Sequence, residues 1–167
     1  DALSRFDRLQ ANYTSEGKDA IHLARLAPSP DLMPVELLRR CFEHVFRTLG
    51  ARALAYAPRD GIARLRAVIA DDLRGQGVPA SADQVLITNG SQQAIDLVVR
   101  LLVSPGDAFF VDGMTYTGVT IALLGAGALT IPVPTDGQGP SLAFLERHAR
   151  SGAKGFYLMP SSQNPTG

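Results

Sequence analysis

The feature that most constrains the fold is a series of four short apolar segments, each separated from the next by a stretch with helical spacing. These segments cover 85–88, 108–111, 129–133 and 156–159. Strands joined by helices run parallel, and a parallel sheet is buried on both faces because its connecting helices cover them. The sequence therefore predicts an α/β fold with three layers, in which a mostly parallel sheet lies between two layers of helices.

Two more helices are predicted before the first of these strands. Apolar residues recur at helical spacing between Pro34 and Gly50, and proline suits the first turn of a helix while glycine favours its end. A second amphipathic pattern runs from Ile62 to Gly75. The irregular residues 1–33, rich in proline near their end, are expected to form an extended arm.

These patterns divide the chain in two. Residues 1–50, the arm and first helix, are expected to be part of a small domain. Residues 51–167 are expected to be the N-terminal part of a larger domain that contains the sheet and is incomplete after Gly167. The single cysteine, Cys41, lies on the apolar stripe of the first helix and is expected to pack there instead of reacting.

Composition argues against several classes of partner. The 16 basic and 16 acidic side chains cancel, so neither nucleic acid nor an anionic membrane surface is an expected partner. No stretch approaches the ~18 apolar residues of a membrane span, and one cysteine allows no internal disulfide, which favours a cytoplasmic location. No spacing of His, Asp or Glu suggests a metal site.

The first candidate site is Gly90-Ser91-Gln92, between the first predicted strand and a predicted helix from Ser91 to Val103. A helix N-terminus has unpaired N–H groups and a partial positive charge, so it binds phosphate well. Gly90 would let the backbone approach a ligand, and Ser91 and Gln92 would add side-chain donors. The residues alone leave a second interpretation equally open, in which Ser91 merely caps the helix.

Two further segments could be turns or sites. Asn164-Pro165-Thr166-Gly167 follows the last predicted strand, at the sheet edge where open α/β folds bind ligands. Asn164 could donate to a ligand oxygen there, although such a tetrapeptide by itself favours a turn. Gly125-Ala126-Gly127 is better explained as a helix-to-strand turn than as a dinucleotide site, because it lacks a third glycine and does not open a helix.

Five motifs in order make residues 20–167 resemble the fold-type I pyridoxal-phosphate enzymes, specifically the class I/II aminotransferases. They are Tyr56-x-x-x-x-Gly61-x-x-x-Leu65-Arg66, Gly90-Ser91-Gln92-Gln93-Ala94, Pro105-Gly106-Asp107 before an apolar strand, Tyr116-Thr117-Gly118 and Asn164-Pro165-Thr166-Gly167. Within that family the chain resembles the aminoadipate/kynurenine aminotransferases and the regulators that fuse a winged helix to an aminotransferase-like domain (MocR type).

The resemblance implies an enzyme that moves an amino group between an amino acid and a 2-oxo acid with pyridoxal 5'-phosphate. The alternative is the effector-sensing domain of a MocR-type transcription regulator, and a more remote one is a lyase or decarboxylase on the same fold. The intact protein is expected to be a homodimer with its active sites at the subunit interface.

The resemblance also implies roles for single residues. Gly90, Ser91 and Gln92 would hold the cofactor phosphate, and Tyr116 would stack on the pyridine ring. Asn164, in a cis peptide bond with Pro165, would donate to the ring hydroxyl oxygen. Tyr56 would reach the phosphate bound by the partner subunit.

No catalytic residue is expected within the chain. The family's Schiff-base lysine lies downstream of the Asn-Pro-Thr-Gly turn, and the only lysines here are Lys18 and Lys154. Lys18 is expected in the exposed arm, and Lys154 at the sheet edge opposite the site. The chain alone is therefore expected to be inactive.

Overall fold

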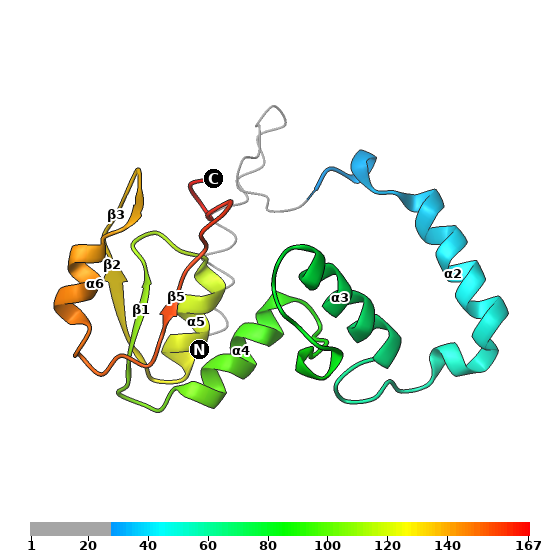
Figure 1. Cartoon of the computed structure of the whole chain (residues 1–167), viewed down its shortest axis with the longest axis horizontal. Coiled ribbons are helices and arrows are strands. Elements are labelled where there is room, and N and C mark those ends of the chain that lie inside the picture. Colours follow the sequence, from blue (N-terminus) through cyan, green and yellow to red (C-terminus); the bar gives the residue numbers. More distant parts are fainter. Residues whose placement is uncertain (1–27) are drawn as a thin grey trace, which may run out of the picture. The chain divides into compact units, whose positions relative to one another are not determined.

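A computed structural model describes residues 28–167 (Figure 1). The chain divides into two compact units, one ending at Tyr56 and the other spanning Ala57–Gly167. The predictions for Lys18 and for most of the arm lie outside the described residues. None of the helices between residues 28 and 167 combines the length and the apolar character needed to cross a membrane.

The first unit contains the long helix predicted to follow the arm. Its elements are η1 (Pro30–Leu32), α2 (Val35–Leu49) and η2 (Gly50–Leu54). Gly50 caps α2 with a φ of 54°, in the left-handed region that glycine adopts without strain. The expectation that Cys41 packs is wrong. Its side chain is exposed, and none of the described residues of α2 is buried.

The second unit begins with the predicted helix α3 (Ala63–Gly75), followed by η3 (Ala82–Gln84). The strand predicted over 85–88 does not form as such. The backbone is extended at Val85, but in the described chain the segment pairs with no strand. The Ile87 N–H donates instead to the loop carbonyl of Asp60, at 3.1 Å.

The remaining elements follow the predicted alternation of helices and strands. In order they are α4 (Ser91–Leu102), β1 (Ala108–Asp112), α5 (Thr117–Gly125), β2 (Leu129–Val133), β3 (Thr135–Asp136), β4 (Gly139–Pro140), α6 (Leu142–His148) and β5 (Phe156–Tyr157). β1 pairs in parallel with β2 on one side and with β5 on the other, which confirms the parallel sheet. The last strand is two residues shorter than predicted, and the antiparallel β3–β4 hairpin was not predicted.

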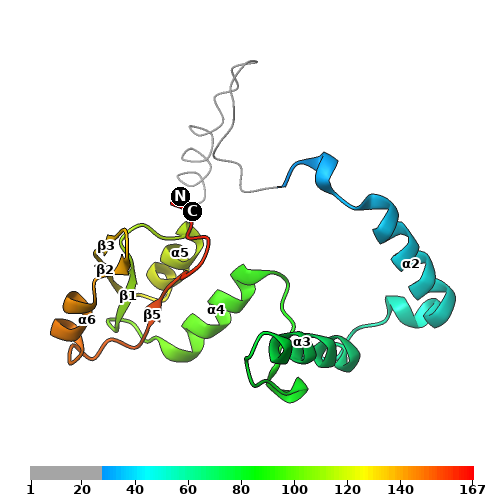
Figure 2. The same cartoon turned by 45° about the horizontal axis from the view of Figure 1, so that its top comes forward.

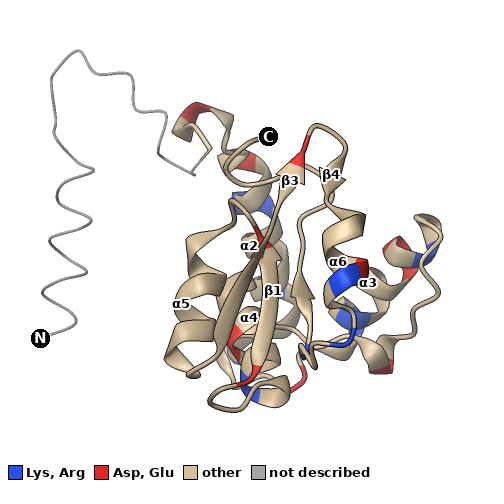
Figure 3. Ribbon diagram, turned by 90° about the vertical axis from the view of Figure 1, so that its left-hand side faces the viewer, with Lys and Arg blue, Asp and Glu red and all other residues tan. Residues whose placement is uncertain are grey.

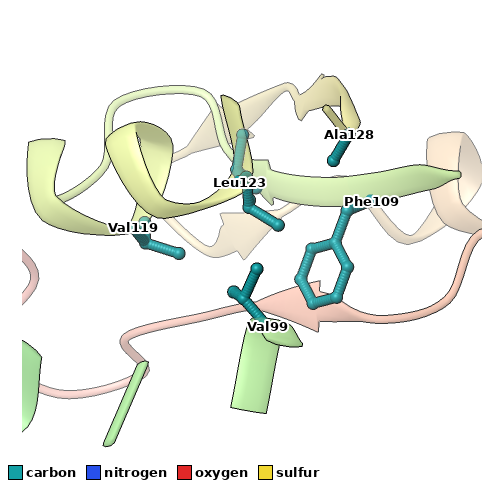
Figure 4. Close-up of a cluster of buried hydrophobic side chains, with 6 residues drawn as sticks. Val99, Phe109, Val119, Leu123 and Ala128 are labelled. Atoms are coloured by element: carbon teal, nitrogen blue, oxygen red, sulfur yellow. The ribbon is translucent and has the colours of Figure 1, made fainter. Parts of the chain in front are cut away.

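The alternation of side chains along β1 separates the two helical layers. Phe109 and Val111 belong to a buried cluster with residues of α4 and α5, namely Val99, Val119 and Leu123, with Ala128 beside them. Figure 4 shows Val99 pointing toward Phe109 and the α5 side chains. Each fully buried side chain of this kind contributes about 1.5–3 kcal/mol, so the cluster fixes α4 and α5 on this face.

The other face of the sheet is covered by α6. Phe110 points away from its neighbours in β1 and packs edge-on against Phe144 of α6 and Phe156 of β5, with ring centroids 6.4 Å apart in each pair. Figures 2 and 3 show α5 and α6 on opposite sides of the strands. The three-layer α/β/α prediction is therefore confirmed.

Candidate functional site

The loops that follow β1 and β5 meet at one edge of the sheet. The two strands are parallel, so Tyr116 and Asn164 both lie at their carboxyl edge, as predicted. Gln163 joins the loops, since its amide nitrogen donates to the carbonyl of Met114. Its amide oxygen accepts from the N–H and hydroxyl of Thr166, at 3.1 and 2.8 Å. The turn that contains half-buried Asn164 is thereby held against the loop before Tyr116.

The Asn164–Pro165 peptide bond is cis, which confirms that prediction. No local motif would have revealed the role of Gln163, because it depends on a contact with a residue 49 positions earlier.

The Gly90-Ser91-Gln92 segment forms the N-terminus of α4. Gly90 is the N-cap, with φ of 81°, and Ser91 is the first helical residue, so the interpretation of Ser91 as the cap is wrong. All three residues are exposed, and a Cβ built on Gly90 would meet no atom within 4 Å. The N-terminus of α4 is therefore exposed. The N–H of Asn89, two residues before the helix begins, donates to the Gln93 amide oxygen at 2.6 Å.

The side chain of Gln92 connects α4 to the start of α5. Its amide nitrogen donates to the carbonyl of Gly118, at 3.1 Å. Tyr116 is the N-cap of α5 and is half-buried. The N-terminus of α4 thus lies beside Tyr116 at the carboxyl edge of the sheet. One donor hydrogen of the Gln92 amide is used within the protein, so at most the other can donate to a ligand, and the cofactor role of this side chain stays a prediction.

A buried carboxylate lies beneath these loops. Asp112, the last residue of β1, is 2% exposed, and its Oδ2 accepts from the Met159 N–H at 3.3 Å. Its Oδ1 and the hydroxyl of Thr115 are buried without a hydrogen-bond partner in the part of the chain described. Burial raises the pKa of the Tyr157 phenol above its ordinary value, and the neighbouring Tyr116 and Asp112 raise it further.

Asp112 was not singled out from the sequence. The available signal was a charged residue closing an otherwise apolar strand. Between residues 28 and 167, no three His, Cys, Asp or Glu side chains gather as metal ligands would.

Lys154 lies at the opposite edge of the sheet, as predicted. Its N–H donates to the carbonyl of Ala108, the first residue of β1, at 2.9 Å. Its side chain is about half exposed, and Nζ lies 3.9 Å from the Asp107 carboxylate. Gly125-Ala126-Gly127 is the predicted helix-to-strand turn, with Ala126 capping α5. Tyr56 is the last residue of the first unit and is fully exposed, and its role stays a prediction.

The arrangement at the carboxyl edge suits a phosphorylated aromatic ligand. The open N-terminus of α4 offers N–H groups and a partial positive charge to a phosphate. The half-buried ring of Tyr116 offers a flat apolar surface beside it. The half-buried amide of Asn164, at the same edge, offers a hydrogen-bond donor.

Residues 32–167 match the family model described as aminotransferase class I and II. The chain belongs to this family. It is 36% identical over 141 residues to the 2-aminoadipate transaminase of Thermus thermophilus, a match covering 84% of this chain and 34% of that protein. A crystal structure of an α-aminoadipate aminotransferase from the same organism, complexed with N-(5'-phosphopyridoxyl)-L-leucine, superposes with a TM-score of 0.76 at 37% identity, over 84% of this chain and 35% of that one.

Regulators also appear among the relatives of this chain. An uncharacterised HTH-type transcriptional regulator of Escherichia coli, YdcR, is 32% identical over 164 residues, or 97% of this chain and 34% of that protein. The chain spans about a third of the length of each of these three proteins.

Proposed function

We propose that the full-length protein is a pyridoxal-phosphate-dependent aminotransferase that moves an amino group between an amino acid and a 2-oxo acid. One observation carries the proposal: the open N-terminus of α4 lies beside Tyr116 at the carboxyl edge of the sheet, in a chain of the class I and II aminotransferase family. When bound, pyridoxal phosphate supplies the electron sink for amino transfer, and the protein supplies orientation and electrostatics.

The residues at the edge then have distinct tasks. Gly90 allows the phosphate to approach the first N–H groups of α4, and the exposed hydroxyl of Ser91 donates to the same phosphate. Gln92 contributes its main-chain N–H. Tyr116 lies against the pyridine ring, and Asn164 donates to the ring hydroxyl oxygen. The lysine that reacts with the cofactor is not Lys154, because that side chain lies at the opposite edge of the sheet.

The assembly follows from the same proposal. The protein is a cytoplasmic homodimer in which Tyr56 reaches the phosphate bound by the partner subunit. Its substrates are amino acids and 2-oxo acids, and this segment binds neither nucleic acid nor a membrane. Residues 1–50 belong to the small domain, and residues 51–167 to the large, cofactor-binding domain. Light scattering of the full-length protein tests the dimer, and a monomer with full cofactor occupancy would contradict it.

Cofactor binding by matched serine variants tests the site itself. In the full-length protein, Ser91→Ala removes a donor to a charged phosphate, worth about 1.5–3 kcal/mol, and is expected to weaken pyridoxal phosphate binding about 10- to 100-fold. Ser151→Ala, an exposed serine in the loop after α6, is the control and is expected to bind as the parent does. Equal affinities in the two variants, measured by absorbance titration, would contradict the site.

Amino transfer is tested separately, by following 2-oxo acid formation from a panel of amino acids. Release of carbon dioxide or ammonia without amino transfer would instead indicate a decarboxylase or lyase on the same fold.

A second candidate function is the effector-sensing domain of a winged-helix transcription regulator of the MocR type. The similarity to the E. coli regulator, which extends over nearly the whole chain, favours it. The two functions differ in what precedes Asp1 in the reading frame. A basic winged-helix segment there, with sequence-specific DNA binding and no amino transfer, would support the regulator.

A further inference from the structure

Gly118 occupies a point where two side chains of the proposed site meet. It is buried in the first turn of α5. A Cβ built on it would lie 2.1 Å from Oε1 of Gln92, and 2.3 and 2.5 Å from Cε1 and Cζ of the Tyr116 ring. Real Cβ atoms do not approach other heavy atoms this closely. The amide of Gln92 and the ring of Tyr116 therefore both occupy the space that any side chain at position 118 would need.

Backbone conformation does not account for a glycine here. Gly118 is helical and has no left-handed φ, and glycine inside a helix is less favourable than alanine. Gly125 ends the same helix, and a Cβ there would meet nothing within 4 Å. The feature that distinguishes position 118 is the contact with Gln92 and Tyr116.

We propose that Gly118 is a positioning residue for the cofactor ring. Because it lacks a side chain, the Gln92 amide and the Tyr116 ring can meet over its α-carbon, and this contact sets the orientation of the Tyr116 ring against the cofactor. This inference rests on the proposed function, which places Tyr116 against the pyridine ring.

The hydrogen bond from Gln92 to the Gly118 carbonyl completes the arrangement. It ties the N-terminus of α4, where the phosphate is held, to the N-terminus of α5, where the aromatic ring begins. The side chain of Gln92 thus fixes the spacing between phosphate site and ring site, while its main-chain N–H remains directed to the phosphate. A substitution at position 118 breaks this link without changing any group that touches the cofactor.

The test compares Gly118→Ala with Gly125→Ala in the full-length protein. Loss of the Tyr116 orientation is expected to weaken pyridoxal phosphate binding about two- to tenfold in Gly118→Ala, as loss of one aromatic contact would. The visible circular dichroism of the bound cofactor is expected to change as well, because it depends on the orientation of the neighbouring ring. Gly125→Ala is expected to match the parent in both measurements.

A double variant separates positioning from general damage. In a Tyr116→Ala background the ring is absent and only the contact with Gln92 remains, so Gly118→Ala is expected to weaken binding less than it does in the parent. An equal loss in both backgrounds, or a Gly118→Ala protein that binds like Gly125→Ala, would overturn the inference.

Gln92→Met provides the same test if Gly118→Ala does not fold. Methionine keeps the length of the side chain and the main-chain N–H but cannot donate to the Gly118 carbonyl. The dichroism of the bound cofactor is expected to change, and an unchanged spectrum and affinity would refute the positioning role. A parent protein that does not bind pyridoxal phosphate at all would instead refute the proposed function.

Discussion

Gly61→Ala is expected to destabilise the start of the second unit. Gly61 is buried, with a φ of 98°, and an added Cβ would lie 2.2 Å from Cγ1 and 2.6 Å from Cβ of Ile87. Neither atom is at the flexible end of its side chain, so the backbone must move. That movement would strain the hydrogen bond from the Ile87 N–H to the Asp60 carbonyl.

The expected cost has two parts. The positive φ costs a residue with a Cβ about 1–2 kcal/mol, and overpacking against Ile87 adds about 1–3 kcal/mol. Gly77→Ala isolates the first part, because Gly77 has a φ of 84° but a Cβ there would meet nothing within 4 Å. The contact with Ile87 should therefore make Gly61→Ala about 1–3 kcal/mol worse than Gly77→Ala.

Hydrogen–deuterium exchange in the full-length protein measures this locally. Amides around Ile87 are expected to exchange faster in Gly61→Ala than in Gly77→Ala, by about tenfold for each 1.4 kcal/mol. Ile87→Ala in the Gly61→Ala background removes the Cγ1 contact and should recover part of the difference. Equal exchange around Ile87 in the two glycine variants would refute the steric argument.

The remaining predictions concern the carboxyl edge and the lysines. Asp112→Ala leaves the Met159 N–H without its acceptor and should lower the free energy of unfolding by about 1–3 kcal/mol. Asp112→Asn keeps an acceptor, and equal urea midpoints for the two variants would contradict this. The raised pKa of Tyr157 means that the unfolded chain releases this proton first, so stability should fall as pH rises above about 10 toward the pKa of the folded protein. Tyr157→Phe should flatten that fall, and identical pH profiles would count against it. Borohydride reduction of the 167-residue chain with pyridoxal phosphate should give no stoichiometric labelling of Lys154 or Lys18, and mass spectrometry that finds one fully labelled would refute it.

Local patterns were sufficient to predict most of the elements. The apolar spacing and the flanking Pro34 and Gly50 define α2, and the apolar run before Asp112 becomes the central strand β1. The segment 85–88 has the same apolar character, yet it forms no ladder because pairing depends on a partner strand. The apolar composition of a segment does not tell whether a partner strand is available to pair with it.

The candidate site was predictable only in outline. The Gly-Ser-Gln sequence after an apolar run indicated the helix N-terminus that the structure has at Ser91. The use of the Gln92 side chain could not be read in the same way, because its partner Gly118 is 26 positions away. Gly118 itself looked like part of a motif, and its contacts with two side chains appear only in three dimensions. Contacts between residues far apart in the sequence determine how the side chains of the site are arranged.

The position of Pro132 determines on which side the sheet can be extended. Leu129 donates its N–H to the carbonyl of Asp107, so alternate residues of β2 face β1, and Pro132 falls on the outward-facing set. A proline has no N–H to donate to a further strand, so β2 is suited to be the outermost strand on this side of the sheet. β5, on the other side of β1, has no proline at Phe156–Tyr157. We therefore expect any additional strand of the full-length protein to join beside β5, and an isolated chain to self-associate through that edge first.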